Sequence, residues 1–258
     1  MREQTIMAAL LLSACGAAQA ERVELSGRTE QRPVQVAAFD KVELKGPDRV
    51  VVRVGPAQSV TLAGDSAVRE RVEVRVDDGK LIVERRDGWT NVSGPRDRAT
   101  VTVTVPRLAA AAVGGSGEMD VDRVGGGDFS AAVGGSGDLR IGEARAGKLE
   151  AAVGGSGDLR FGRVEADSVE MAIGGSGTIG AAGRTRTVEA SIGGSGNVEA
   201  GGLRARTAEV SIAGSGDVAV NASDTASISM VGSGDVVVSG GARCTTSKMG
   251  SGSVRCGG

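Results

Sequence analysis

The chain has 258 residues, enough for one large domain or two small ones. It contains 43 Gly, no His, no Tyr, one Trp and three Phe, so any core must consist of thin layers of Val, Ile, Leu and Ala. The formal net charge of −2 gives no electrostatic reason to expect nucleic acid as a partner, and a chain without His has no ordinary catalytic triad and no His metal site.

Residues 1–20 are typical of a signal peptide rather than of structure. Arg2 supplies a basic start, a short apolar run follows, and small residues come next. Residues 12–15 (Leu-Ser-Ala-Cys) resemble a lipobox, in which Cys15 is lipidated, whereas residues 18–20 (Ala-Gln-Ala) resemble an ordinary cleavage site. Both alternatives predict an exported protein in the periplasm, the outer membrane or at the cell surface. Contact with the membrane is expected only through a lipid anchor on Cys15.

Residues 21–106 contain short runs that alternate apolar and polar residues, as strands do. We expect these opening strands to form irregular coils continuous with the repeats that follow; a small separate β-domain is the alternative. Asp78-Gly79 marks a tight hairpin. Trp89, the single Trp, lies in a charged loop, where it would either stack on a sugar or a protein partner or plug the open end of the first coils. The alternating runs are 34–36, 41–44, 50–54, 72–76, 81–85 and 100–105.

From residue 107 to residue 258 a Gly-Ser-Gly motif recurs at a nearly constant spacing, which is the signature of a solenoid. The steps between successive serines are 20, 20, 20, 19, 20, 18 and 18 residues. We expect each motif to be one corner of one coil, where Gly adopts positive φ and the Ser hydroxyls form a ladder bonded to the corner backbone. The serines are Ser116, Ser136, Ser156, Ser176, Ser195, Ser215, Ser233 and Ser251.

Alignment on the repeated Ser places apolar residues three before and three after it, such as Val133 and Leu139. Positions seven and five before and five after keep the same two-residue period, so each side of the corner is predicted to be a strand. Successive coils would stack at about 4.8 Å, and no coil could bury its apolar side alone. The sequence therefore predicts an all-β parallel β-helix, or solenoid, with coils of about 20 residues.

The last repeat departs from the others. Lys248 occupies an inward apolar position and Thr246 precedes it by two residues, as expected where a terminal coil caps the stack. Cys244 and Cys256 fall in inward columns of the same coil. An even number of cysteines in an exported protein predicts a disulfide; two buried thiols are the alternative, and no metal site is expected.

The chain resembles the putative auto-transporter adhesin head domain, or GIN domain. The resemblance rests on Gly-Ser-Gly followed by Asp or Asn and an apolar residue, as at 135–139 and 194–198, and on 39–44 and 78–83. It covers about residues 36–252. It implies a right-handed β-helix exported to the envelope and brings no catalytic residues; adhesion is a label by analogy.

Two outward columns carry carboxylates. The residue two after each Ser is mostly Asp or Asn, which we expect to cap the amides of the corner; calcium is the rival, although the calcium-binding β-roll repeats every nine residues. The second column lies six before successive serines. Stacked carboxylates repel, so these either splay into solvent or are bridged by a cation or a basic partner, which makes them a candidate binding site together with Trp89. The first column is Glu118, Asp138, Asp158, Thr178, Asn197, Asp217, Asp235 and Ser253; the second is Glu150, Glu170, Glu189 and Glu209.

A strip of small residues is predicted to lie beside the Glu column. Such a strip either accepts another rod or a polymer or simply suits a flat stacked sheet. It consists of Ala112, Ala132, Ala152, Ala172, Ser191, Ser211, Ser229 and Ser247.

These patterns favour a non-catalytic, envelope-associated module for binding, adhesion or structure, with no cofactor. The expected partner is an envelope protein or a glycan, with self-association through the Ala/Ser strip as a further interpretation. The alternative is a polysaccharide-active β-helix enzyme that uses paired acids such as Asp138 and Asp158.

Overall fold

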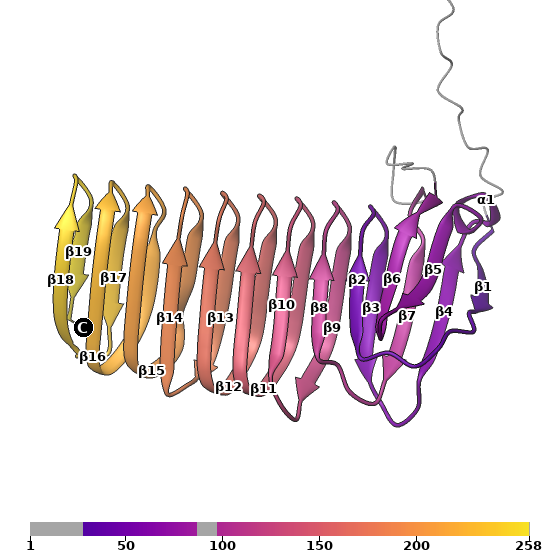
Figure 1. The fold of residues 1–258 in the computed structure, drawn as a ribbon, viewed down its shortest axis with the longest axis horizontal. Coiled ribbons are helices and arrows are strands. Elements are labelled where there is room, and N and C mark those ends of the chain that lie inside the picture. The colour runs from indigo at the N-terminus through magenta and orange to yellow at the C-terminus, as the bar shows by residue number, and fades with distance from the viewer. Residues whose placement is uncertain (1–27, 87–96, 258) are drawn as a thin grey trace, which may run out of the picture.

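A computed structural model describes residues 28–86 and 97–257. These residues are nearly all β and form a solenoid, drawn in Figure 1 as a rod of stacked coils. The predicted fold class is therefore confirmed. The one helix of the described residues is α1 (Ser66–Arg69). The strands are β1 (Glu30–Pro33), β2 (Lys41–Leu44), β3 (Arg49–Val54), β4 (Ser59–Gly64), β5 (Val72–Asp77), β6 (Lys80–Arg85), β7 (Thr100–Val105), β8 (Ala110–Val113), β9 (Glu118–Gly125), β10 (Phe129–Val133), β11 (Asp138–Val153), β12 (Asp158–Ile173), β13 (Thr178–Arg184), β14 (Thr187–Ile192), β15 (Asn197–Gly214), β16 (Val218–Gly232), β17 (Asp235–Ser239), β18 (Arg243–Met249) and β19 (Ser253–Cys256).

Each regular coil has two limbs, one before the Gly-Ser-Gly corner and one after it. We call the two sheets that these limbs build the pre-corner face and the post-corner face. In Figure 1 the corners form the upper edge of the rod, and a rounded turn closes each coil at the lower edge. Strands in neighbouring coils pair in parallel, with Val133 beside Val153 and Asp138 beside Asp158, so the register follows the 20-residue step.

The shorter steps later in the chain are absorbed at the rounded turn. Register shifts occur there, between Phe161 and Val164 and between Ala200 and Arg204. On both sides of the corner the ladders continue in register, as with Val231 beside Met249. The corners therefore remain aligned although the coils differ in length.

The core is a single file of thin layers. Apolar side chains at alternate positions of both limbs point inward, and those from Phe39 to Val238 form one continuous buried cluster. Leu139 and Leu159 in neighbouring coils are fully buried. Because each layer is covered only by the layers above and below it, stacking is the source of stability.

The reason for glycine at the corner differs from the prediction. The glycine before the Ser has positive φ only in the last three coils, at Gly214, Gly232 and Gly250. In the earlier coils glycine is required by close approach instead: a Cβ on Gly155 would lie 2.1 Å from the carbonyl oxygen of Gly135. The expectation of positive φ at every corner is therefore wrong, and contact between stacked backbones replaces it.

The opening residues do not follow chain order along the rod. β2 pairs with both β6 and β8, and β3 pairs with both β7 and β9, all in parallel. The coil β2–β3 thus lies between the coil β6–β7 and the first regular coil. Beyond β6 and β7 the end is closed by antiparallel strands, β5 on one sheet and β4 with β1 on the other, with α1 beside them (Figure 1). The domain boundaries at residues 20 and 106 remain predictions.

A buried ion pair joins two of these opening coils. Arg85 donates from Nε and Nη2 to the carboxylate of Asp48 at 2.7 and 2.6 Å, and Asp48 also accepts the backbone N–H of Ala99 at 2.8 Å. Asp48 is completely buried. Its segment occupies the corner position, because a Cβ on Gly117 of the next coil would meet the Asp48 carbonyl oxygen at 2.3 Å. The pair therefore fixes a corner that lacks the Gly-Ser-Gly motif.

Candidate binding groove

A groove of about 870 Å³ runs along the pre-corner face in the half nearer the rounded turn. We call it the axial groove. It crosses the strands from β11 to β18, and its lining comes from the positions eight, seven and six before the corner serines. The lining residues are Lys148, Ser168, Val169, Glu170, Thr187, Val188, Glu189, Thr207, Ala208, Glu209, Thr225, Ala226, Ser227, Arg243 and Thr245.

Two files of polar side chains border the axial groove. The carboxylates of Glu170, Glu189 and Glu209 are in register on successive coils. Two residues earlier in each coil, Ser168 and three threonines form a parallel file of hydroxyls. The residue between the hydroxyl position and the carboxylate position points into the core, as Val188 and Ala208 do. The two files of polar side chains therefore form the sides of the groove, and the backbone between them forms its floor. The threonines are Thr187, Thr207 and Thr225.

Lys148 holds the first two carboxylates of the predicted Glu column together. Its Nζ lies 2.6 Å from Oε1 of Glu150 and 2.9 Å from Oε2 of Glu170. The hydrogen bond with Glu150, and next in size the one with Glu170, raise the pKa of Lys148. The chain thus supplies its own bridging cation at one end of the column, a residue that sequence reasoning missed although Lys148 stands two before Glu150.

The other two carboxylates of the column lack such a cation. Glu189 and Glu209 are exposed, and neither forms an ion pair with any residue in the described ranges. They occupy the middle of the axial groove, between Lys148 at one end and Arg243 at the other. Two acceptor-only side chains are therefore open to an external partner at this point.

The acidic column after the corner divides into two parts. In the later coils the side-chain oxygens of Asn197, Asp217 and Asp235 accept the backbone N–H of the equivalent residue in the next coil, at 3.2, 2.9 and 3.0 Å. The hydroxyl of Ser253 also donates to Asp235, and these bonds lower the pKa of Asp235. This is the predicted capping of corner amides.

In the earlier coils the same column forms ion pairs. Arg140 donates to Asp138 at 2.9 Å and Arg160 donates to Asp158 at 3.0 Å. The two acids considered for catalysis are thus in register on neighbouring coils, each held by an arginine two residues on. Neither lines the axial groove.

The corner serines are exposed along the sharp edge of the rod. Their backbone N–H groups bond the preceding coil, as from Ser156 to the carbonyl of Gly135 at 3.1 Å. Their hydroxyls make no hydrogen bond within the described ranges, so the predicted bonding of the hydroxyls to the corner backbone is wrong. The carbonyls that they would have reached are already taken by backbone N–H groups of the next coil. All eight are exposed: Ser116, Ser136, Ser156, Ser176, Ser195, Ser215, Ser233 and Ser251.

The Ala/Ser strip lies on the pre-corner face beside the axial groove, with Ala132, Ala152 and Ala172 in register on successive coils. Self-association through it stays a prediction. A smaller hollow of about 400 Å³ lies at the rounded turn. Arg184 pairs there with Glu165 and lowers its pKa, and Arg186 pairs with Asp167. Arg206 also lines the hollow and forms no ion pair within the described ranges.

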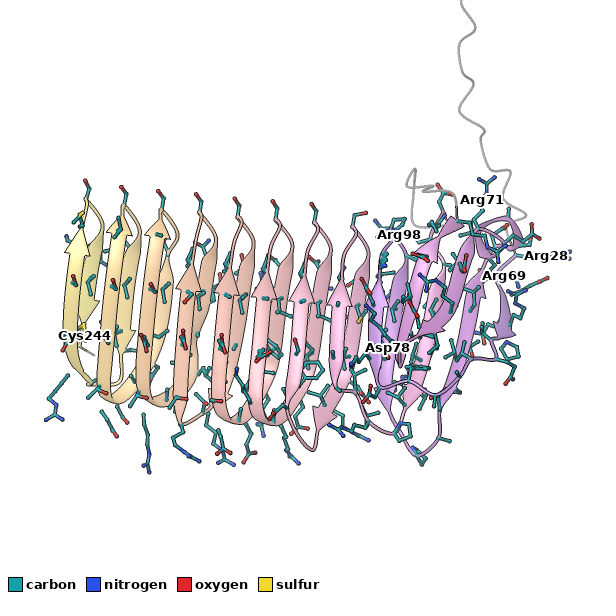
Figure 2. All side chains as sticks on the ribbon, viewed as in Figure 1. Arg28, Arg69, Arg71, Asp78, Arg98 and Cys244 are labelled. Atoms are coloured by element: carbon teal, nitrogen blue, oxygen red, sulfur yellow. A yellow bond between two sulfur atoms is a disulfide. The ribbon has the colours of Figure 1, made fainter. Side chains whose placement is uncertain are left out.

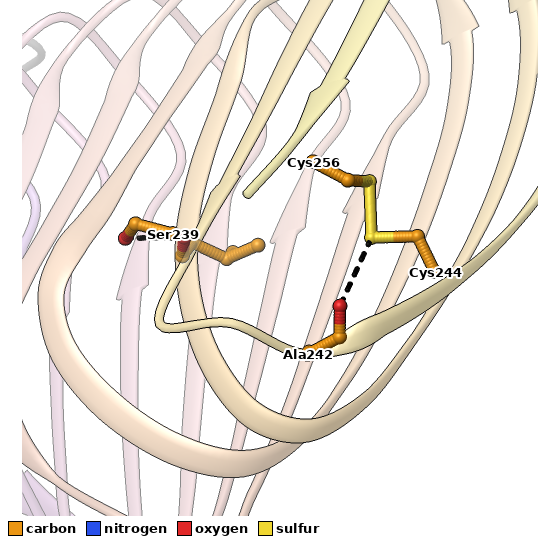
Figure 3. The surroundings of a disulfide bond; sticks show 5 residues. Ser239, Ala242, Cys244 and Cys256 are labelled. Atoms are coloured by element: carbon orange, nitrogen blue, oxygen red, sulfur yellow. Dashed lines mark hydrogen bonds between the residues drawn. A yellow bond between two sulfur atoms is a disulfide. The ribbon is translucent and has the colours of Figure 1, made fainter. Parts of the chain in front are cut away.

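The last coil carries a disulfide between Cys244 and Cys256, which ties β18 to β19 (Figure 3). Lys248 donates from Nζ to the carbonyl of Gly252 at 2.6 Å across the same end. Lys248, which departs from the apolar columns, thus donates a hydrogen bond within the terminal coil.

Cys15 and Trp89 lie outside the described residues. Within the described ranges no group of three or more His, Cys, Asp or Glu side chains is placed to hold a metal ion. The same part of the chain has no helix that is long and apolar enough to cross a membrane.

Three solved structures share the architecture. A protein from Parabacteroides distasonis described as a putative lipid binding protein has a TM-score of 0.82 at 24% identity, covering 91% of this chain and 98% of that one. A putative adhesin from the same species has a TM-score of 0.81 at 23% identity, covering 89% and 97%. A putative adhesin from Parabacteroides merdae has a TM-score of 0.82 at 19% identity, covering 90% and 97%. At these identities the likeness shows the fold alone.

No curated protein matches the chain. The model of one family does match, over residues 38–242, which is most of the sequence and includes the opening coils, most of the axial groove and nearly all the corners. The chain therefore belongs to the family described as putative auto-transporter adhesin, head GIN domain.

Proposed function

We propose that the chain is a non-catalytic binding module of the cell envelope that holds an extended partner in the axial groove. The observation that carries the proposal is the pairing of a carboxylate file with a hydroxyl file along the rod, in which Glu189 and Glu209 form no ion pair with any described residue. The family points to an adhesin-like protein at the envelope or outside the cell that binds another molecule.

The chemistry of the groove favours a polymer that offers hydrogen-bond donors. Carboxylates accept only, and threonine hydroxyls both donate and accept. Both files repeat once per coil, at about 4.8 Å, so an extended glycan or polypeptide bearing amino or hydroxyl groups would meet the same pair of side chains on each coil. The groove lining contains no aromatic side chain, so recognition would rest on these polar groups.

The proposal assigns no catalytic residue. Asp138 and Asp158 are each engaged by an arginine, and burial does not shield either carboxylate from solvent. A polysaccharide-active enzyme would need its paired acids beside the bound sugar, and neither of these acids lines the axial groove.

Binding to immobilised polysaccharides tests the proposal, with chitosan oligomers as the amino-bearing probe, a neutral glucan and a polyuronate. We expect the wild-type chain to bind one of the first two and the double substitution Glu189→Lys and Glu209→Lys to weaken that binding at least tenfold. Glu199→Lys is the matched control, because Glu199 lies on the post-corner face outside the groove, and it should leave binding unchanged.

Two results would contradict the proposal. Equal binding by the wild type and the groove variant would remove the axial groove as the site. Release of soluble sugar from any polysaccharide would show turnover and overturn the non-catalytic assignment.

Export and anchoring belong to the same proposal. A signal peptide over residues 1–20 would place the rod outside the cytoplasm, and lipidation of Cys15 would anchor it to a membrane. Labelling of the chain by palmitate, lost on Cys15→Ser, is the expected result for the lipoprotein. A mature chain that begins at Glu21 without label would leave only the soluble form.

A further inference from the structure

The end of the rod at β18 and β19 presents open sheet edges. β18 pairs only with β16, and β19 pairs only with β17, within the described residues. Each strand therefore leaves one row of backbone N–H and C=O groups without a strand partner, which is a template for adding another strand. The disulfide between Cys244 and Cys256 holds the two edges together.

The side chains at this end differ from those on the rest of the rod. The large apolar side chains that are exposed in the described residues are Val231, Val237 and Met249, all on the last two coils. Met249 is 71% exposed. From residue 236 to residue 258 the sequence contains three basic residues and no acidic one. The end is thus apolar and cationic, and a strand-forming segment with apolar side chains and a carboxylate would complement it.

The opposite end is closed in a different way. The last strands there are antiparallel to their neighbours: within the described residues β5 pairs only with β6, and β1 pairs only with β4 and ends in Pro33, which has no N–H to donate. Arg28, where the described chain begins, lies at this end in Figure 2, and Cys244 lies at the other. The two ends of the rod are therefore not equivalent.

Residues 22–27, Arg-Val-Glu-Leu-Ser-Gly, repeat the sequence of a pre-corner strand. β14 contains Val188-Glu189-Ala190-Ser191 and β15 contains Ala208-Glu209-Val210-Ser211, whereas this segment reads Val23-Glu24-Leu25-Ser26. Aligned in the same columns on β18, Val23 would lie over Cys244 and Leu25 over Thr246. Gly27 would lie over Lys248 and leave room for its amine, and Glu24 would lie close to Arg243.

The segment cannot reach this edge within its own chain. On the pre-corner face nine strand spacings separate β6 from β18, through β2, β8, β10, β11, β12, β14, β15 and β16. At about 4.8 Å each this is about 43 Å. The six residues before Arg28 span at most about 22 Å.

We propose that residues 22–27 of one copy add as a parallel strand to the open β18 edge of a second copy, so that rods associate head to tail. The contact is heterologous and leaves the same two ends free at each junction, so it extends into linear assemblies rather than closed dimers. It does not depend on what the axial groove binds.

Cysteine cross-linking between two populations tests the register. The chain is purified from Glu21 onward, which retains every described residue and omits Cys15. Ser26→Cys is placed on one population and Ser247→Cys on the other, because stacked neighbours in this column lie within the Cα separation that a disulfide spans. We expect the mixture, on mild oxidation, to give a covalent dimer at least ten times more abundant than either population gives alone.

Ser229→Cys, in the same column one coil inward and already covered by Ser247, is the matched control and should give no dimer with Ser26→Cys. Equal yields from the two positions, dimers from Ser26→Cys alone, or no dimer in the mixture would each overturn the proposal. A cross-link within one chain between Ser26→Cys and Arg75→Cys on β5 would also overturn it, because the segment would then complete its own end.

A second variant gives an independent measurement. Val23→Glu with Leu25→Glu should abolish concentration-dependent association in sedimentation velocity, while the circular dichroism spectrum stays unchanged because both positions precede the described fold. Unchanged association in this variant would contradict the assigned segment.

Discussion

The Asp48–Arg85 pair shows how one polar contact substitutes for a missing corner motif. Both side chains are buried, and the carboxylate also caps the amide of Ala99. Removal of one partner leaves a buried charge without compensation, which is far more costly than the loss of a surface pair.

We therefore expect Arg85→Met to lower the free energy of unfolding by about 3–5 kcal/mol, as found when one partner of a buried pair is removed. The measurement is chemical denaturation followed by circular dichroism. Arg186→Met is the control, because Arg186 pairs with Asp167 on the surface, and it should change the free energy by at most about 1 kcal/mol. Equal losses for the two variants would show that the buried pair has no special role.

For single residues, the sequence indicated where a side chain lies on the rod better than which groups it contacts. The columns placed Glu170 and Glu189 outward and in line, as the structure has them. They did not reveal Lys148 as the bridge, because the position eight before the corner Ser holds Lys in this coil alone and Ser or Thr in the next four, so no column of like residues marks it. Arg85 and Asp48 lie outside the repeat, so no periodicity linked them.

The Gly-Ser-Gly corner is the element that sets the fold, and its glycines differ from the glycine that precedes it. Gly154 and Gly155 are adjacent in sequence, yet a Cβ on Gly154 would meet nothing within 4 Å, whereas one on Gly155 would lie 2.1 Å from the carbonyl oxygen of Gly135. Of these two neighbours, only Gly155 is required by the stacking of one coil on the next; the Cβ of a residue at Gly157 would likewise lie 2.0 Å from the carbonyl oxygen of Gly137.

Substituting each of these two glycines in turn tests whether the stacking of neighbouring coils is the reason for glycine in the motif. Gly155→Ala should destabilise the rod by about 1–3 kcal/mol or more, since overpacking forces the backbones of two coils apart. Gly154→Ala should change stability by less than about 0.5 kcal/mol, as at an open surface position. Thermal unfolding of both variants gives the comparison, and a larger loss for Gly154→Ala would refute stacking as the reason for the motif.

The elements of the regular coils were predictable because one spacing determines them. Fixing the serines fixes the inward columns, and the parallel ladder then follows from the need to cover each layer. The opening coils lacked that constraint. Nothing local in 41–54 shows that β2 and β3 lie between the coil β6–β7 and β8–β9, because that order depends on pairings between segments far apart in the chain.

At the scale of the whole molecule the rod is a one-dimensional stack, so its stability is distributed coil by coil. An interior coil is held on both sides, whereas the coil β18–β19 is held by its neighbour on one side only among the described strands. Local opening should therefore begin at this end, and the disulfide stands where it opposes such opening.

Replacement of both cysteines, Cys244→Ser with Cys256→Ser, tests this role. The bridge spans 12 positions in sequence, and closing a loop of that size contributes about 3 kcal/mol in the chain-entropy model. Each coil contacts only the coils directly beside it, so the loss of stability should stay local. Amide hydrogen exchange should accelerate in β18 and β19 and stay unchanged in β11 and β12. A uniform acceleration along the rod would show that the coils unfold as one unit. Since the open β18 edge is also the proposed docking site, the same variant should weaken head-to-tail association.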